Sequence, residues 1–110
     1  MAQYERRFQG DFDQVLDRLN RGILNGSSTA SYEGGSDWSS GNVRCAVRVY
    51  ERYSVMGGNR LSLNMTLVGE GNSLFLCGIT AGGSQAAFFK INTWGEEAFL
   101  DKFRALAEQL

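Results

Sequence analysis

Alternating apolar and polar residues predict several β-strands along the chain. The clearest is Asn42 to Tyr53, in which valines and Cys45 alternate with arginines and Tyr50. Arg60 to Val68 alternates as cleanly, with leucines and Met65 on one face. A period of two residues is typical of a strand with one buried face. The other predicted strands are residues 4–8, 27–32, 73–81 and 84–92.

Two segments instead repeat their apolar residues at the spacing of an α-helix. The first follows Asp11, which we expect to be an N-cap with Gln14 as the second half of a capping box. The second follows Thr93, with Glu96 in the same relation. The apolar stripes of the two predicted helices are Phe12, Val15, Leu16, Leu19 and Ile23, and Phe99, Phe103, Leu106 and Leu110.

Between the first helix and the long strands, the polar residues 33–41 predict a flexible loop that contains Trp38. The strands of residues 42–53 and 60–68 form a hairpin, and we expect their apolar faces to coincide. A three-residue loop, residues 56–58, achieves this by pairing Tyr53 with Leu61 and Arg48 with Thr66. This register also places Arg44 opposite Glu70.

Two-residue turns at Gly71-Asn72 and Gly82-Gly83 extend the meander. Their strands are apolar on both faces, and the turns place one apolar set on the side of the arginines, away from the core. This set is Phe75, Cys77, Ile79, Ala86 and Phe88.

The predicted order is β-α-β-β-β-β-β-α in a single α+β domain, residues 1–110, with two helices packed on one face of an antiparallel sheet. By this order the chain resembles a shortened helix-grip fold, the group that includes the START and Bet v 1-like carriers of hydrophobic ligands. The resemblance implies a ligand between the sheet and the last helix. Met65, Phe99 and Phe103 are the residues that could line such a pocket.

Composition narrows the functional classes. The chain has no histidine, which removes the commonest general base and the commonest metal ligand. Eleven basic and twelve acidic residues give a formal net charge of −1, so no global field favours nucleic acid or an anionic membrane. We expect no enzyme activity, no cofactor, no metal and no nucleic-acid or membrane partner.

The sequence shows neither a signal segment nor a membrane-spanning segment, and this bears on the cellular compartment that we expect. The N-terminal residues have no apolar signal segment, and the longest apolar run, Leu74 to Cys77, is too short to cross a bilayer. We therefore expect a cytoplasmic protein. Its two cysteines, Cys45 and Cys77, are expected to be buried thiols.

Four residues of one strand face are candidates for a polar surface: Arg44, Arg48, Tyr50 and Arg52. One interpretation is a row that grips phosphate or carboxylate groups. The other is a solvated face whose arginines are paired with nearby acidic residues.

The second apolar face of residues 73–92 needs a cover. A second copy of the chain is the simplest cover, with Phe75, Cys77, Ile79, Ala86 and Phe88 as interface candidates. A loop carrying Trp38 that folds over the face and an internal pocket for an apolar ligand are the alternatives.

Three segments carry a further resemblance: residues 48–54 (RVYERYS), 57–60 (GGNR) and 89–97 (FKINTWGEE). They are similar to a family of small single-domain proteins of clostridial and related bacteria, classed as a domain of unknown function. The resemblance covers nearly the whole chain and implies no known activity, ligand or catalytic residue. The sequence thus predicts a non-catalytic homodimeric interaction module, with a carrier or sensor of a small apolar or amphiphilic ligand as the alternative.

Overall fold

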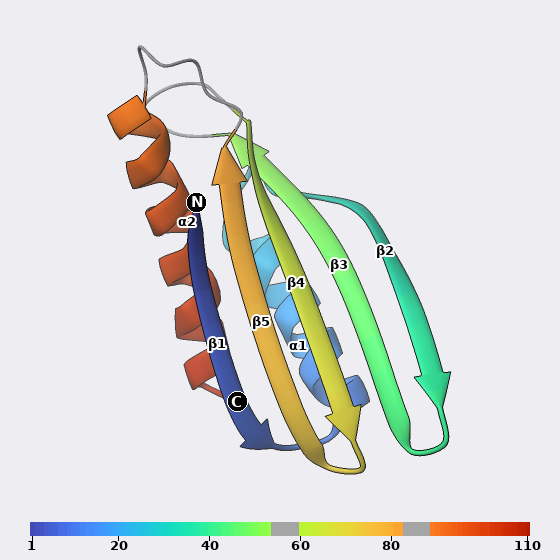
Figure 1. Ribbon diagram of the computed structural model, residues 1–110. Helices are drawn as coiled ribbons and strands as arrows, with labels where there is room; N and C mark the ends of the chain where they lie inside the picture. Colours follow the sequence, from blue (N-terminus) through green and yellow to red (C-terminus); the bar gives the residue numbers. More distant parts are fainter. Residues whose placement is uncertain (54–59, 83–88) are drawn as a thin grey trace.

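Five antiparallel strands form the sheet, in the order β1-β5-β4-β3-β2, and two helices lie on one side of it (Figure 1). The structure is a computed structural model that describes residues 1–53, 60–82 and 89–110, with the backbone alone for residues 89–94. These residues confirm the α+β class, the antiparallel sheet and the two helices. The elements are β1 (Ala2–Gln9), α1 (Phe12–Asn25), β2 (Ser31–Ser40), β3 (Val43–Tyr53), β4 (Arg60–Glu70), β5 (Ser73–Gly82) and α2 (Phe89–Glu108).

Helix α1 begins at its predicted N-cap. The Asp11 carboxylate accepts a hydrogen bond from the Gln14 backbone N–H at 2.9 Å, which satisfies one of the free donors of the first turn. The side chains that α1 buries against the sheet are Phe12, Val15, Leu19 and Ile23.

Two strand glycines bring both helices onto the same face. A Cβ atom at Gly69 of β4 would lie 2.9 Å from the Phe12 ring of α1, and one at Gly78 of β5 would overlap the Phe103 ring of α2. Gly78 pairs with Met65, which lies four residues from Gly69 on the same face of β4. The rings therefore approach the strand backbone at glycines, where no side chain keeps them away.

The prediction of a last strand, residues 84–92, is wrong for the part that the structure describes. Residues 89–92 belong to α2, which begins at Phe89, so Thr93 lies inside the helix instead of capping it. Residues 84–88 lie outside the described residues. A short apolar stretch does not distinguish a buried strand from a buried helix turn, which is why periodicity failed here.

The predicted loop of residues 33–41 is also wrong. Residues 31–40 form β2, which pairs with β3 from Ser31 opposite Glu51 to Ser40 opposite Val43. Eight of its ten residues are exposed, so the strand needs no apolar alternation, and its backbone hydrogen bonds to β3 suffice to hold it.

The register of β3 against β4 differs by one residue from the prediction. Tyr53 pairs with Arg60 and Arg48 with Met65, so Arg44 lies opposite Gly69, not Glu70. A shift of one residue exchanges the two faces of a strand. The arginine face of β3 therefore shares the helix side with the leucines of β4, and the valine face of β3 points away from the helices.

The arginine face can line the helix side because two of its residues, Ala46 and Tyr50, are apolar enough to be buried. Ala46 and Tyr50 are fully buried there beside Leu63 and Leu67 of β4. The predicted register assumes that the most apolar faces of β3 and β4 coincide, and it leaves Ala46 and Tyr50 out of the core. Arg48 lies between the two, and the arginines of this face bind a carboxylate, as Arg44 and Arg48 do, or lie over a ring, as Arg52 does.

Gly78 gives a direct test of the close packing of α2. We expect Gly78→Ala to lower the free energy of unfolding by about 1 to 3 kcal/mol, because the new methyl group overlaps the buried Phe103 ring. Urea unfolding measures this. In a Phe103→Leu background the same change should cost clearly less, and equal costs in both backgrounds would contradict the contact.

Candidate interaction surface

The sheet face that points away from the helices is a continuous surface, here called the open face. Its residues follow from the register, because directly opposed residues of antiparallel strands point to the same side. One row across the sheet runs Arg7, Phe75, Val68, Cys45 and Trp38, from β1 to β2.

The next two rows place apolar residues of β3 and β5 beside the first, with polar residues on the strands between and around them. They comprise Glu5, Cys77, Thr66, Val47 and Ser36, and Gln3, Ile79, Asn64, Val49 and Gly34.

The side chains of the open face are less buried than those of the opposite face. Leu61, Leu63, Met65 and Leu67 of β4 are completely buried by the helices. The alternate residues of β3 and β5, such as Val47 and Cys77, are only half-buried, with no helix packed on them in the described chain. Apolar side chains in this state form a patch that favours a partner.

Three of the five predicted interface residues lie on this face. Phe75, Cys77 and Ile79 alternate along β5, all half-buried. Ala86 and Phe88, the other two, lie outside the described residues.

Sequence reasoning missed the β3 part of the open face. Val43, Cys45, Val47 and Val49 were assigned to the core because their strand was paired in the wrong register. The unbroken alternation of these residues does indicate one apolar face of the strand. The predicted register places that face toward the helices, whereas in the structure it points away from them. The alternative cover, a loop carrying Trp38, is contradicted because Trp38 belongs to β2 and pairs with Cys45.

The polar-surface candidates of β3 lie on the helix side, opposite to Phe75, which corrects the prediction that they share its face. Arg44 binds Asp13 of α1 through two hydrogen bonds of 2.9 and 3.0 Å, and its guanidinium lies 4.2 Å from the centre of the Phe12 ring. The hydrogen bonds from Arg44 lower the pKa of Asp13, and the same pair raises the pKa of Arg44.

Arg48 lines a groove between α1 and the β2–β3 hairpin, whereas Tyr50 is fully buried and does not line it. Arg48 binds Asp37 of β2 at 2.9 Å, and the Tyr50 hydroxyl donates to Asn20 Oδ1 of α1 at 2.6 Å. Burial raises the pKa of Tyr50 to about 12. The groove has a volume of about 450 Å³ and is lined by Asp13, Leu16, Asp17, Asn20, Leu24, Tyr32 and Arg48.

Arg52 is the most buried of the arginines of β3. Its side chain is 8% exposed, and its guanidinium lies 4.6 Å from the centre of the Phe99 ring of α2. Desolvation lowers the pKa of Arg52. It is part of the packing under α2 and does not present its charge to a ligand on the open face.

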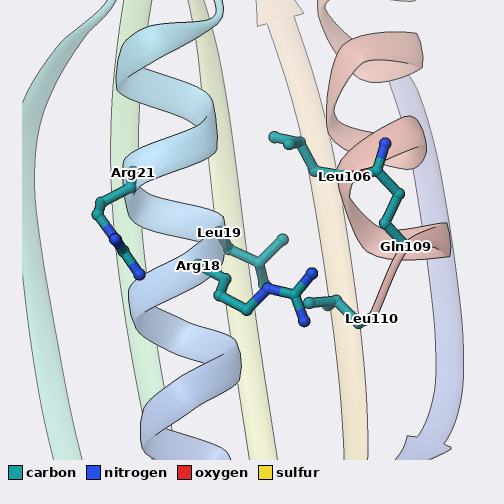
Figure 2. A pocket seen from close by; sticks show the side chains of 6 residues that line it. All are labelled: Arg18, Leu19, Arg21, Leu106, Gln109 and Leu110. Carbon is teal, nitrogen blue, oxygen red and sulfur yellow. The ribbon is translucent and has the colours of Figure 1, made fainter.

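The pocket candidates Met65, Phe99 and Phe103 lie together in the core, each no more than 3% exposed. Because Phe103 packs directly against Gly78, a ligand between the sheet and α2 would have to displace these side chains. The cleft shown in Figure 2 lies at the other side of α2, against α1, and has a volume of about 200 Å³. Its lining residues are Arg18, Leu19, Arg21, Leu106, Gln109 and Leu110.

Both cysteines are free thiols on the open face, where they are half-buried instead of fully buried as the sequence suggested. Burial, and to a lesser degree the charge of Glu5, raises the pKa of Cys77, which makes its thiol a poor nucleophile. Among residues 1–53, 60–82 and 89–110, no three acidic or cysteine side chains are grouped as metal ligands would be. No helix in this part of the chain is long and apolar enough to cross a membrane.

Comparison with known protein families gives one finding over the full length. The sequence model of DUF6054, a family of unknown function, matches residues 1–110. No curated protein matches the chain.

The Arg44–Asp13 pair predicts a pH-dependent contribution to stability. Because the folded state lowers the pKa of Asp13 below its ordinary 3.8, the contribution is present above that value and is lost as the pH falls through the folded-state pKa. Asp13→Asn should therefore lower the melting temperature at about pH 6 and have a smaller effect at about pH 3, below the ordinary pKa of the carboxyl group. In an Arg44→Gln background, Asp13→Asn should not change the melting temperature at either pH. If it still lowers the melting temperature there, the effect comes from a contact other than the Arg44–Asp13 pair.

Proposed function

The chain belongs to the DUF6054 family, whose function is unknown, and we propose from its geometry that it is a non-catalytic interaction module that pairs with a second copy through the open face. The observation that supports this is the position of the valines of β3 beside Phe75, Cys77 and Ile79, on the face without helices. The proposed partner is another copy of this chain.

The size of the open face suits a dimer. Five strands about 4.8 Å apart, each about ten residues long at 3.3 Å per residue, give a face of roughly 800 Å². Stable protein interfaces bury about 800 Å² on each partner. One copy can therefore cover the open face of the other without leaving a large apolar area in water.

The placement of charge on the open face resembles that of an interface, because charged residues lie at its margin. Val47, Cys77 and Ile79 flank Asn64 and Thr66 of the central strand β4, which are polar but uncharged, while Glu5 and Arg7 lie at the β1 side. Interfaces typically have an apolar centre depleted of charge and a polar rim. Two sheets that pack face to face lie about 10 Å apart, with side chains of this size filling the space.

A second copy is the simplest partner, because a two-fold axis places each apolar patch on an identical one. Isologous pairing needs no other protein, and it brings the rim residues Glu5 and Arg7 of both copies to the border of the interface. An unrelated partner would need a separate apolar surface of matching shape, whereas a second copy already carries one.

The proposal assigns no reaction to the protein. The chain has no histidine, and on the helix side Arg44 and Arg48 are engaged by Asp13 and Asp37. We place the dimer in the cytoplasm, where free thiols such as Cys45 and Cys77 stay reduced.

Ile79→Glu tests the proposal. The side chain is half-buried in the single copy, so the folded chain can accept a carboxylate there, whereas a dimer would bury that charge without a partner. We expect the dissociation constant of the open-face dimer to rise at least about a hundredfold in sedimentation experiments, with the circular dichroism unchanged.

Gln14→Glu, on the exposed side of α1, adds a carboxylate far from the open face and should leave the assembly unchanged. Val47→Lys is a second open-face variant in case Ile79→Glu does not fold. A wild-type protein that stays monomeric at about 100 µM, or open-face variants that assemble like wild type, would refute the proposed function.

A further inference from the structure

The two edge strands of the sheet, β1 and β2, differ in how far they are protected from pairing with another chain. At the β1 edge, Tyr4 meets the Phe103 ring of α2 edge-on with the ring centres 6.2 Å apart, and Arg6 donates to the carbonyl oxygen of Ala107. Glu5, Arg6 and Arg7 also place three charged residues in this strand. Charges and a covering helix are common ways to prevent an edge from pairing with another chain.

The β2 edge has little such protection. The strand pairs with β3 on one side only, and its sequence, SYEGGSDWSS, contains no lysine, arginine or proline. Its one irregularity, between Tyr32 and Gly34, lies near its beginning. Within residues 34–40, every second residue therefore directs an unpaired backbone donor and acceptor away from β3, in a regular row.

Two residues on the same face of β2 have complementary shapes. Trp38 is 61% exposed, the most exposed of the large aromatic side chains described. Gly34, four residues earlier, has no atom within 4 Å of the position that a Cβ would take. Trp38 pairs with Cys45 and Gly34 with Val49, so both lie on the open face.

We propose that β2 pairs antiparallel with β2 of a second copy about a two-fold axis at Ser36. In this register Ser36 lies opposite Ser36 of the second copy, and each Trp38 lies opposite Gly34 of the other chain. The indole ring then covers the glycine backbone of its neighbour, as aromatic residues do beside strand glycines. Both exposed indoles become buried by one symmetric contact.

The charges of the strand are compatible with this register. Asp37 lies opposite Gly35 of the second copy, so the carboxylates do not face each other directly, and each remains bound to Arg48 of its own chain at 2.9 Å. A register centred on Asp37 would instead place the two carboxylates opposite each other. The pairing at Ser36 is therefore favoured by electrostatics as well as by shape.

The β2 contact is formed by the backbone edge of the strand and by Gly34, Ser36 and Trp38 at the border of the open face, whereas the open-face interface centres on β3, β4 and β5, so neither contact requires the other. It joins two sheets edge to edge into one sheet of ten strands, with both open faces on the same side. If two such pairs stack through their open faces, the assembly contains four copies. The oligomeric states of variants at Ile79 and at Ser36 therefore report on the open-face contact and the β2 contact separately.

The test uses Ser36 in an Ile79→Glu background, which removes the open-face contact. Ser36 is exposed in the single copy, so a charged side chain there does not disturb the fold. On the two-fold axis, Ser36→Glu places a carboxylate opposite an identical carboxylate, and Ser36→Lys does the same with an ammonium group. At low ionic strength we expect each variant to raise the dissociation constant of the β2 dimer about tenfold.

An equimolar mixture of the Ser36→Glu and Ser36→Lys proteins should restore dimers, because each contact then joins opposite charges. Ser28→Glu and Ser28→Lys, at an exposed position outside the strands, are the matched controls and should dimerise like the parent. Every second amide of residues 34–40 points away from β3. Amide hydrogen exchange should show these outward-facing amides protected in the dimers and unprotected in the separated chains, whereas the amides between them are hydrogen-bonded to β3 in both states.

A parent that is monomeric at about 100 µM, or charge variants that are not rescued by mixing, would overturn the β2 pairing. A failure of rescue by mixing does not bear on the proposed function, which the comparison of wild type with Ile79→Glu decides separately. If Ile79→Glu assembles like wild type but the mixing experiment succeeds, the proposed open-face dimer fails and the β2 pairing stands.

Discussion

The pairing of β3 with β4 determines the two faces of this protein. Because Arg48 lies opposite Met65, the arginine face of β3 joins the leucines under the helices, and Val47 is left on the open face with Thr66. A shift of one residue would move the valines into the core and the arginines into solvent. The extent of the apolar open face, and with it the proposed assembly, depends on this register.

The register is stable because the arginines have specific partners on the helix side. Asp13 and the Phe12 ring of α1 engage Arg44, and the Phe99 ring of α2 lies against Arg52. An arginine stem packs as an apolar group while its guanidinium binds carboxylates or lies over an aromatic face. Between them, Tyr50 is fully buried and its hydroxyl is hydrogen-bonded to Asn20, so no unsatisfied hydroxyl opposes the pairing.

Much of the fold could be predicted from the sequence, because local signals specify it. The Asp11 cap, the apolar stripe of α1 and the Gly71-Asn72 turn are encoded by neighbouring residues, and all three are present. The register and the strand β2 depend on distant partners, which periodicity does not contain. Phe75, Cys77 and Ile79 could be predicted for the open face because β5 is apolar on both sides. Val47 could not, because pairing the apolar faces of β3 and β4 gives a register that is wrong by one residue and places Val47 in the core.

Nuclear Overhauser contacts between the backbone protons of β3 and β4 test the central claim most directly. We expect cross-strand contacts that join Val47 to Thr66 and Cys45 to Val68, which are opposed residues in the register of the structure. Contacts that join Arg48 to Thr66 and Arg44 to Glu70 as opposed pairs would contradict it. In that case the valines would lie under the helices, and the open face would lose its β3 half.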